Sequence, residues 1–172
     1  ALPAAVVVAD MKTLDAGAIE TEIAFEAGAD IVSISGLAHD STIKGSARVK
    51  DRYNRRLMVD LLMTTSPVLR AREVERLGAD IICLHTGVDA QKSMRSKLKL
   101  SPVLSTLART LKVPLAAAGG INPRLAPRFA AAGVRVLIVG GWITGSTDPY
   151  RAALEVVTRL RGTDVKEDQR SV

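Results

Sequence analysis

Two acidic residues and a lysine stand close together near the start of the chain, with types and spacing that could do chemistry. Asp10, Lys12 and Asp15 follow an apolar run at residues 6–8, which predicts a buried strand of a parallel sheet. Strand periodicity puts Asp10 and Lys12 on the same side, and Asp15 falls where a loop or a first helical turn would begin. Charges at the end of a buried strand are costly without a partner. The group therefore either closes the strand as an ion pair or binds a metal ion or a charged ligand.

Two further strand ends carry groups suited to catalysis. Asp60 lies in a predicted strand at residues 57–62, and His85 follows the predicted strand at residues 80–84. Two carboxylates in a polar cavity suit Mg²⁺, a lysine beside the cation can stabilise an oxyanion, and a histidine can transfer a proton near neutral pH. A structural role for His85 is the alternative. His39, in a polar turn, is predicted to be an exposed loop residue.

Pairs of glycines follow the last two predicted strands, at residues 113–118 and 134–139: Gly119-Gly120 and Gly140-Gly141. Glycine lets backbone N–H groups approach phosphate oxygens closely, and a helix start after Asn122 adds a positive dipole. A tight turn is the simpler explanation of a single pair. Two pairs after consecutive strands favour a phosphate-binding site.

Strands and helices are predicted to alternate along the chain. Besides the strands already given, one is predicted at residues 31–35, and helices are predicted at residues 16–27, 42–54 and 67–77, up to about 111, from 122 to 133 and from 149 to about 160. The segment at residues 26–32 recurs at 76–82, with a weaker copy at 132–137. Six strands, each followed by a helix, predict a parallel sheet with right-handed crossovers. This pattern fits an open doubly wound sheet or a (β/α)8 barrel that lacks two units.

The glycine pairs favour the second of these architectures. (β/α)8 TIM barrels commonly bind phosphate with the loops after strands seven and eight, so the two strands before the glycine pairs are predicted to be strands seven and eight. The chain then holds only strands 3–8 and their helices, as a partial barrel at residues 1–161. Residues 162–172 are polar and charged, and are predicted to form a disordered tail.

The composition narrows the classes of function. The chain has 172 residues, is 47% hydrophobic but only 3% aromatic, and carries a net charge of +6. The basic residues are scattered through predicted helices without aromatic side chains to stack on bases, so no nucleic acid is predicted as a partner. Cys83 lies in an apolar run and is predicted to be a reduced core residue. Because no signal peptide or membrane-length apolar segment is visible, the chain is predicted to be cytoplasmic, with no membrane partner.

The hexapeptide at residues 10–15 resembles the Asp-x-Lys-x-x-Asp motif that ends the third barrel strand in the orotidine monophosphate decarboxylase superfamily. Within that superfamily the sequence most resembles the 3-hexulose-6-phosphate synthases, over nearly the whole chain apart from the tail. The segments that carry the resemblance are residues 9–17, 26–32, 42–45, 59–61, 85–91, 118–122 and 138–141.

The resemblance implies an aldehyde-lyase of the aldolase type. It would condense formaldehyde with D-ribulose 5-phosphate to give D-arabino-hex-3-ulose 6-phosphate, with Mg²⁺, in the ribulose monophosphate pathway of formaldehyde fixation or in detoxification. By similarity, Asp10 binds the metal, Lys12 stabilises a 1,2-enediolate and His85 is the base at substrate C1. Asp60 and the two glycine pairs would contact the substrate and its phosphate. The enzyme would be a homodimer with shared active sites, and Asp15 would reach into the partner's site.

Several departures from the family pattern keep other interpretations open. The first two strands, which supply an acid and a glutamate metal ligand in the family, are absent, so the chain is expected to be a fragment. A catalytically inactive phosphosugar-binding or assembly module is therefore one alternative. A 3-keto-L-gulonate 6-phosphate decarboxylase is another, although Val88 and Gly141 stand where that enzyme carries arginines. Trp142 replaces a small residue of the family and is expected to crowd the phosphate loop.

Overall fold

The computed structural model describes residues 5–89 and 102–168, with side chains up to residue 162. Six parallel strands form one sheet in the order β1-β2-β3-β4-β5-β6. The strands are β1 (Val8–Thr13), β2 (Ile31–Ser35), β3 (Arg56–Asp60), β4 (Ile81–His85), β5 (Leu115–Ala118) and β6 (Val136–Ile138). The helices are α1 (Gly17–Glu26), α2 (Asp40–Tyr53), α3 (Pro67–Arg76), α5 (Pro102–Thr110), α6 (Ala126–Ala131), α7 (Gly141–Thr144) and α8 (Pro149–Asp168).

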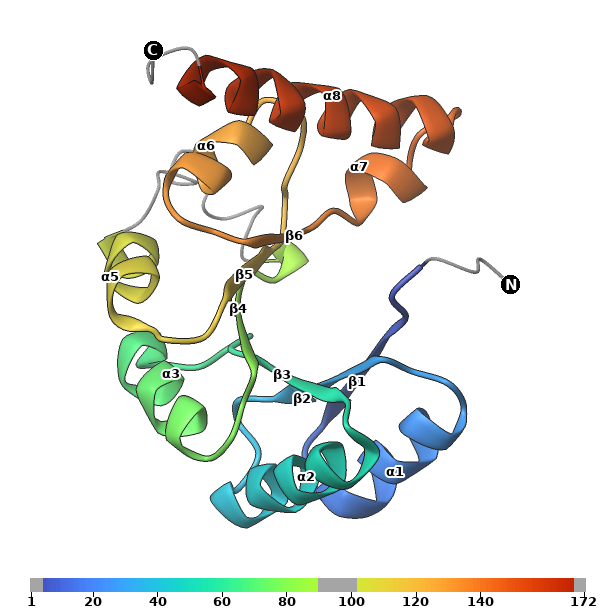
Figure 1. Ribbon diagram of the computed structural model, residues 1–172, viewed down its shortest axis with the longest axis vertical. Helices are drawn as coiled ribbons and strands as arrows, with labels where there is room; N and C mark the ends of the chain where they lie inside the picture. Colours follow the sequence, from blue (N-terminus) through green and yellow to red (C-terminus); the bar gives the residue numbers. More distant parts are fainter. Residues whose placement is uncertain (1–4, 90–101, 169–172) are drawn as a thin grey trace.

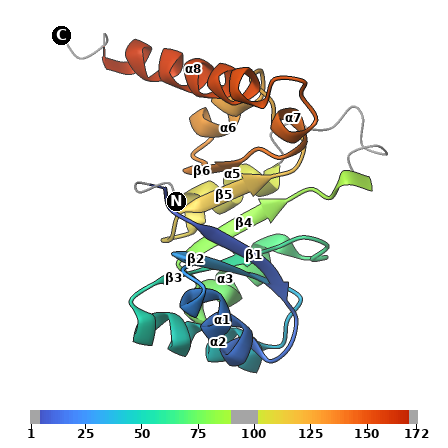
Figure 2. The same ribbon diagram turned by 90° about the vertical axis from the view of Figure 1, so that its right-hand side faces the viewer.

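The sheet is curved, and helices cover its outer side. Figure 1 shows α1, α2, α3, α5, α6 and α8 along the outside of the arc, and Figure 2 shows the strands running in one direction across it. A doubly wound sheet would carry helices on both faces. The chain is therefore a parallel α/β half-barrel of the TIM-barrel type, the architecture that the glycine pairs favoured, and the open doubly wound alternative is wrong.

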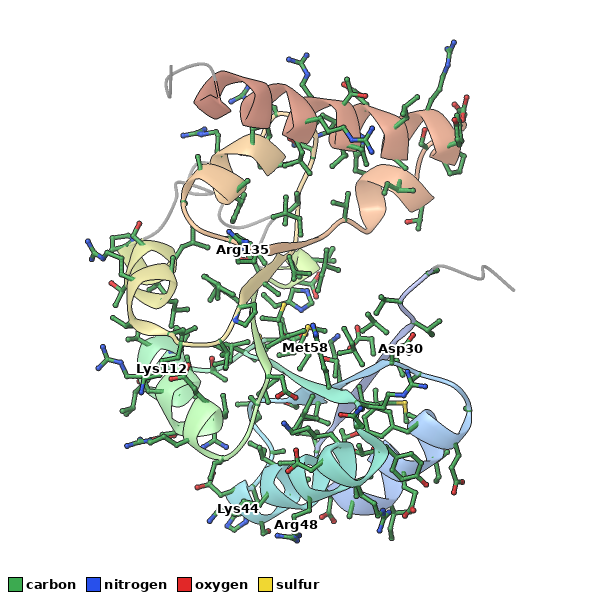
Figure 3. The ribbon with its side chains drawn as sticks, in the orientation of Figure 1. Asp30, Lys44, Arg48, Met58, Lys112 and Arg135 are labelled. Carbon is green, nitrogen blue, oxygen red and sulfur yellow. The ribbon has the colours of Figure 1, made fainter. Side chains whose placement is uncertain are left out.

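Each face of the sheet buries its own set of side chains, because successive strand residues point to opposite sides. The larger cluster lies between the sheet and the helices and includes Val32, Leu57, Val59 and Ile82. A smaller cluster lies on the inner face: Met58, Ile81, Cys83, Ala116 and Ala118, with Ile31 packed against it. Figure 3 shows Met58 pointing to this inner side, whereas Lys44 and Arg48 point outward from α2. Cys83 is buried here, as its apolar surroundings predicted.

The prediction of a buried first strand is wrong. Val6, Val7 and Val8 are exposed, because β1 is an edge strand that pairs with β2 alone. Val136 and Ile138 of β6, at the opposite edge, are also partly exposed. An apolar run shows that a segment forms a strand, but its burial depends on how many neighbours that strand has.

The helix boundaries differ from the predicted ones in four places. Residues 141–144 form a short helix that was not predicted, and α6 begins at Ala126 rather than residue 122. The helix α2 begins at Asp40 rather than residue 42, and the exposed His39 caps it, because its Nδ1 accepts the Ser41 N–H. In addition, α8 continues to Asp168, past the predicted boundary at residue 161. A lone glycine costs a helix only about 1 kcal/mol and need not end it. The predicted disorder of residues 169–172 lies outside the described residues.

Candidate active site

The first part of the site is built by a distortion at the end of β1. The register between β1 and β2 shifts between Asp10 and Thr13, and Lys12 has a left-handed backbone, with φ 48°. This conformation is unfavourable for a residue with a side chain, and such strain concentrates at functional sites. It brings the Lys12 Nζ to 2.6 Å from Asp10 Oδ2. Asp10 and Lys12 are therefore together, as strand periodicity predicted, although the strand is bulged between them.

Asp60, the last residue of β3, connects Lys12 to His85. Its Oδ2 lies 2.8 Å from His85 Nδ1 and 3.3 Å from Lys12 Nζ, and its Oδ1 accepts the Leu62 N–H at 2.9 Å. Only 6% of the Asp60 side chain is exposed. Three strand ends thus bring together one network, Asp10–Lys12–Asp60–His85, because the carboxyl ends of parallel strands meet at one edge of the sheet. The sequence singled out all four residues but did not predict that Asp60 would hold His85.

The network favours the charged forms of Asp60 and Lys12. Burial alone raises the pKa of Asp60, but the hydrogen bond with His85, the charge of His85, the Leu62 N–H and the charge of Lys12 outweigh it, and the pKa lies below its ordinary value. Burial lowers the pKa of Lys12, but Asp10 and Asp60 outweigh it and raise that pKa. At neutral pH the site therefore holds a buried carboxylate and an ammonium group. An ionised carboxylate can only accept a hydrogen bond, so His85 Nδ1–H donates to Asp60 Oδ2, and Nε2 is the nitrogen left to act as a base.

A cavity of about 540 Å³ places His85 beside both glycine pairs. Gly119 and Gly120 have left-handed backbones, with φ 98° and 67°, which glycine adopts without strain. A Cβ atom at Gly140 or Gly141 would meet nothing within 4 Å, so the space above that loop is open. The residues that line the cavity are His85, Val88, Ala118, Gly119, Gly120, Ile121, Asn122, Ile138, Gly140, Gly141 and Trp142. The structure therefore brings the predicted base and the predicted phosphate loops to one hollow.

Apolar side chains of the cavity were missed in the sequence. Ile121 and Ile138 form part of its wall, and neither has a residue type that indicates a site. Strand parity was the available signal for Ile138, because it stands two positions before Gly140 and so faces the same side. Trp142 was expected to crowd this loop and does line the cavity.

Asp15 is the one predicted catalytic residue that stays apart from the network. It is exposed, and the contact found for its side chain is with the next backbone N–H, from Ala16 to Oδ1 at 2.8 Å. Ala16 has φ 52° and turns the chain into α1. Within a single chain, the Asp15 side chain therefore bonds the neighbouring backbone and takes no part in the network.

One carboxylate oxygen of the network is available to a cation. Asp10 is more than half exposed and its second oxygen, Oδ1, has no contact in the described part of the chain. Residues 5–89 and 102–168 contain no group of three acidic, histidine or cysteine side chains arranged around one point. Mg²⁺ commonly takes one or two carboxylates and completes its shell with water and substrate oxygens. Asp10 can contribute one carboxylate oxygen to such an ion, but the described residues do not form a dedicated cage.

Two other features concern the helices and their charges. In the described ranges, none of the helices combines the length and apolarity needed to cross a bilayer. Three basic residues of the α2 region form ion pairs: Lys50 with Asp80, Arg52 with Glu22 and Arg55 with Asp30.

Comparison with known proteins agrees with this geometry. The chain is 40% identical over 154 residues to 3-hexulose-6-phosphate synthase of Mycobacterium gastri, an alignment that covers 90% of this chain and 73% of that relative. A solved structure of a 3-hexulose-6-phosphate synthase superposes with a TM-score of 0.85 and 38% identity, over 92% of this chain and 75% of the other. A 3-keto-L-gulonate-6-phosphate decarboxylase from Vibrio cholerae is more distant, with 26% identity, a TM-score of 0.79 and coverage of 94% and 74%.

A family match covers the same region. Residues 4–156 match the pattern of the orotidine 5'-phosphate decarboxylase / HUMPS family, and these residues include the whole Asp10–Lys12–Asp60–His85 network and both glycine pairs. The chain belongs to the orotidine 5'-phosphate decarboxylase / HUMPS family.

Proposed function

We propose that this chain is a lyase of the 3-hexulose-6-phosphate synthase type, which condenses formaldehyde with D-ribulose 5-phosphate to D-arabino-hex-3-ulose 6-phosphate. The observation that carries the proposal is the Asp10–Lys12–Asp60–His85 network, which meets the two glycine pairs at His85. The identity of 40% to a named synthase supports the same reaction. In this proposal β1–β6 correspond to strands three to eight of a barrel, since the Asp-x-Lys-x-x-Asp motif ends β1 and glycine pairs follow β5 and β6.

The glycine pairs would bind the substrate through its phosphate. The backbone turns left at Gly119 and Gly120, and space is open above Gly140 and Gly141. Backbone N–H groups at such turns bind anions without adding a titratable side chain. Binding there would put the sugar against the apolar wall and its far end toward His85.

His85 and Lys12 would carry the proton transfer and the charge. His85 Nε2 takes a proton from C1 of the sugar, and the electron pair of that C–H bond forms the enediolate double bond as the C2 carbonyl becomes an oxyanion. Lys12, held as an ammonium by Asp10 and Asp60, faces the developing negative charge. C1 then bonds to the formaldehyde carbon, C2 becomes a carbonyl again, and the formaldehyde oxygen takes the proton from His85. When bound, Mg²⁺ would supply further positive charge, with Asp10 as its protein ligand.

We further propose a homodimer in which Asp15 serves the partner's site. Large apolar side chains are exposed beside it and at neighbouring strand ends: Met11, Leu14, Leu37 and Met63. A group of exposed apolar residues around a polar site is typical of an interface. If the sites are shared, mixing inactive Lys12→Ala with inactive Asp15→Ala restores turnover, because a mixed dimer contains one intact site. If the mixture remains as inactive as its components, Asp15 does not act across an interface.

The decarboxylase is the weaker alternative. Val88 and Gly141 line the cavity, and neither can supply the cation expected there for a decarboxylase by resemblance. The structural neighbour that is named a 3-keto-L-gulonate-6-phosphate decarboxylase is also less similar in sequence than the synthases. The cavity therefore favours the condensation.

The test measures formaldehyde consumption and hexulose phosphate formation by this chain with D-ribulose 5-phosphate, first with Mg²⁺ and then with EDTA. The proposal predicts turnover that EDTA removes and that Lys12→Ala lacks. Lys44→Ala is the matched control, since Lys44 is an exposed lysine that points outward from α2. Binding of the sugar phosphate without turnover would indicate a binding module, and CO2 release from 3-keto-L-gulonate 6-phosphate would indicate a decarboxylase.

A further inference from the structure

Trp142 lies at the glycine-rich end of the cavity. It is the chain's single tryptophan, and it follows the glycine pair after β6 directly, as the second residue of α7. Its side chain borders the cavity with His85 and is 44% exposed. Because Gly140 and Gly141 leave open space above the loop, the indole is the bulky group at this end of the cavity.

A second hollow begins at the same tryptophan. It has a volume of about 530 Å³ and runs along the segment between α7 and α8, where Ser146, Thr147 and Arg151 line it. Of the residues that line the two hollows, Gly141 and Trp142 belong to both. Since glycine has no side chain, the indole is the side chain that stands between them.

We propose that Trp142 is a specificity-determining residue, whose indole closes the phosphate end of the cavity against the second hollow. The cavity then accepts a sugar that ends in a phosphate monoester and excludes one whose phosphate carries a further group. This inference rests on the part of the proposed function that assigns the phosphate to the glycine pairs. It adds what that function leaves open, namely how the site rejects nucleotide-like sugar phosphates that share the same phosphate.

The physical reason is that the indole stands between the phosphate end of the cavity and the second hollow. A group attached there would have to displace the indole or lie outside the cavity, and forcing atoms into an occupied volume weakens binding by at least about tenfold. Removing the indole would join the two hollows. A second phosphate and a nucleoside could then extend toward Ser146, Thr147 and Arg151, whose side chains are polar or basic.

The test compares two probes by isothermal titration calorimetry. Ribose 5-phosphate ends at its phosphate, whereas ADP-ribose carries the same sugar phosphate extended by AMP. The unaltered chain is expected to bind ribose 5-phosphate at least about tenfold more tightly than ADP-ribose, and Trp142→Ala to bring this ratio close to one. Trp142→Phe, which keeps a smaller ring, should give an intermediate ratio and guards against misfolding of the alanine variant. Tyr150→Ala is the control, because Tyr150 is an exposed aromatic residue of α8 outside both hollows.

Each outcome decides the proposal. A ratio that falls in both Trp142 variants but not in Tyr150→Ala supports it. Equal binding of the two probes by the unaltered chain, an unchanged ratio in folded Trp142 variants, or no binding of either probe overturns it. The condensation assay separates this result from the proposed function. If the chain turns over but substitution of Trp142 leaves the binding ratio unchanged, the lyase proposal stands and the role of Trp142 is removed. If the ratio responds to substitution but the chain does not turn over, the role of Trp142 stands and the lyase proposal fails.

Discussion

Two lysines of this chain sit in nearly the same electrostatic surroundings at opposite ends of the sheet. Lys12 Nζ lies 2.6 Å from one carboxylate and 3.3 Å from a second, those of Asp10 and Asp60. Lys50 Nζ lies 2.7 Å from Asp80 and 3.3 Å from Asp51. Both lysines lose hydration by burial, yet their carboxylate partners raise the pKa of each.

The lysines differ in exposure and in what else their partners do. The Lys50 side chain is 12% exposed and that of Lys12 is 36% exposed. Asp80 also accepts the Leu57 N–H through Oδ2 at 2.8 Å and so ties α2 to the start of β3. Asp60 instead holds His85, at the rim of a cavity.

The backbone shows the same difference. Lys50 lies in the regular helix α2, whereas Lys12 keeps a left-handed φ, a conformation that costs about 1–3 kcal/mol in a residue with a side chain. In TIM barrels the carboxyl ends of the strands carry function and the amino ends carry stability. The comparison teaches that the role of an ion pair must be inferred from its surroundings. The distances alone are nearly the same at the two ends of the sheet.

The largest expected effect is that of Lys12→Ala on turnover. Removal of the ammonium leaves the developing oxyanion without its donor, which lowers kcat by at least about 10²–10³-fold. Since the side chain is partly exposed and its backbone is strained, the thermal unfolding midpoint should change little. The measurement is kcat with D-ribulose 5-phosphate and formaldehyde beside a thermal melt. A variant with a clearly lower unfolding midpoint and an unchanged kcat would make Lys12 a stabilising residue like Lys50, and would remove the contrast.

Asp60→Asn comes second, because it acts on His85. An amide can donate to Nδ1 and so favours the wrong tautomer, which should lower kcat by about 10²–10⁴-fold, the usual contribution of general base catalysis. The pKa of Asp60 is lowered from its ordinary value of 3.8. Its contribution to stability is therefore complete above that value and is lost as pH falls through the lower pKa of the folded state.

The variant should consequently lose part of the acid dependence of stability. Unfolding by urea, followed from pH 6 down to about pH 2, compares the two chains. Parallel stability curves over this range would show that Asp60 is not held as a carboxylate in the folded protein.

Lys50→Met is expected to lower stability without lowering turnover, the opposite of Lys12→Ala. Methionine keeps much of the aliphatic volume but leaves Asp80 without its cation, so the free energy of unfolding should fall by about 1–3 kcal/mol. Turnover per folded molecule should be unchanged, because Lys50 is at the far end of the sheet from the cavity. The pKa of Lys50 is raised above its ordinary 10.5, so the loss is complete below that pH and disappears as pH rises through the folded pKa. A fall in kcat without a fall in stability would contradict the assignment.

Much of this arrangement could be predicted from the sequence, because many of its features depend only on residues that are close together in the chain. The type of each strand end, the glycine pairs and the repeated segment at residues 26–32 and 76–82 are visible in one pass, because they depend on a few neighbouring residues. The exposure of Val6–Val8 and the contact between Asp60 and His85 are not visible. They depend on which strand lies at an edge and on which strands are neighbours, and this information is spread over the whole sheet. The proposed role of Asp15 concerns a second chain, and no pattern within one chain could test it.

The smallest expected effect separates the two copies of the repeated segment. Asp30 and Asp80 occupy equivalent positions, and each accepts a backbone N–H at 2.8 Å, from Val7 and from Leu57. Asp30, however, pairs with the more exposed Arg55 and anchors an edge strand. Asp30→Asn should therefore cost no more than about 1 kcal/mol of stability and should act locally, by speeding hydrogen exchange at the Val7 amide. Asp80→Asn, beside the less exposed Lys50, should cost more and lower protection across β3. Equal losses of stability from the two substitutions would mean that the exposure of the paired cation does not determine how much each aspartate contributes. The contrast between Lys12 and Lys50 would then depend on the cavity alone.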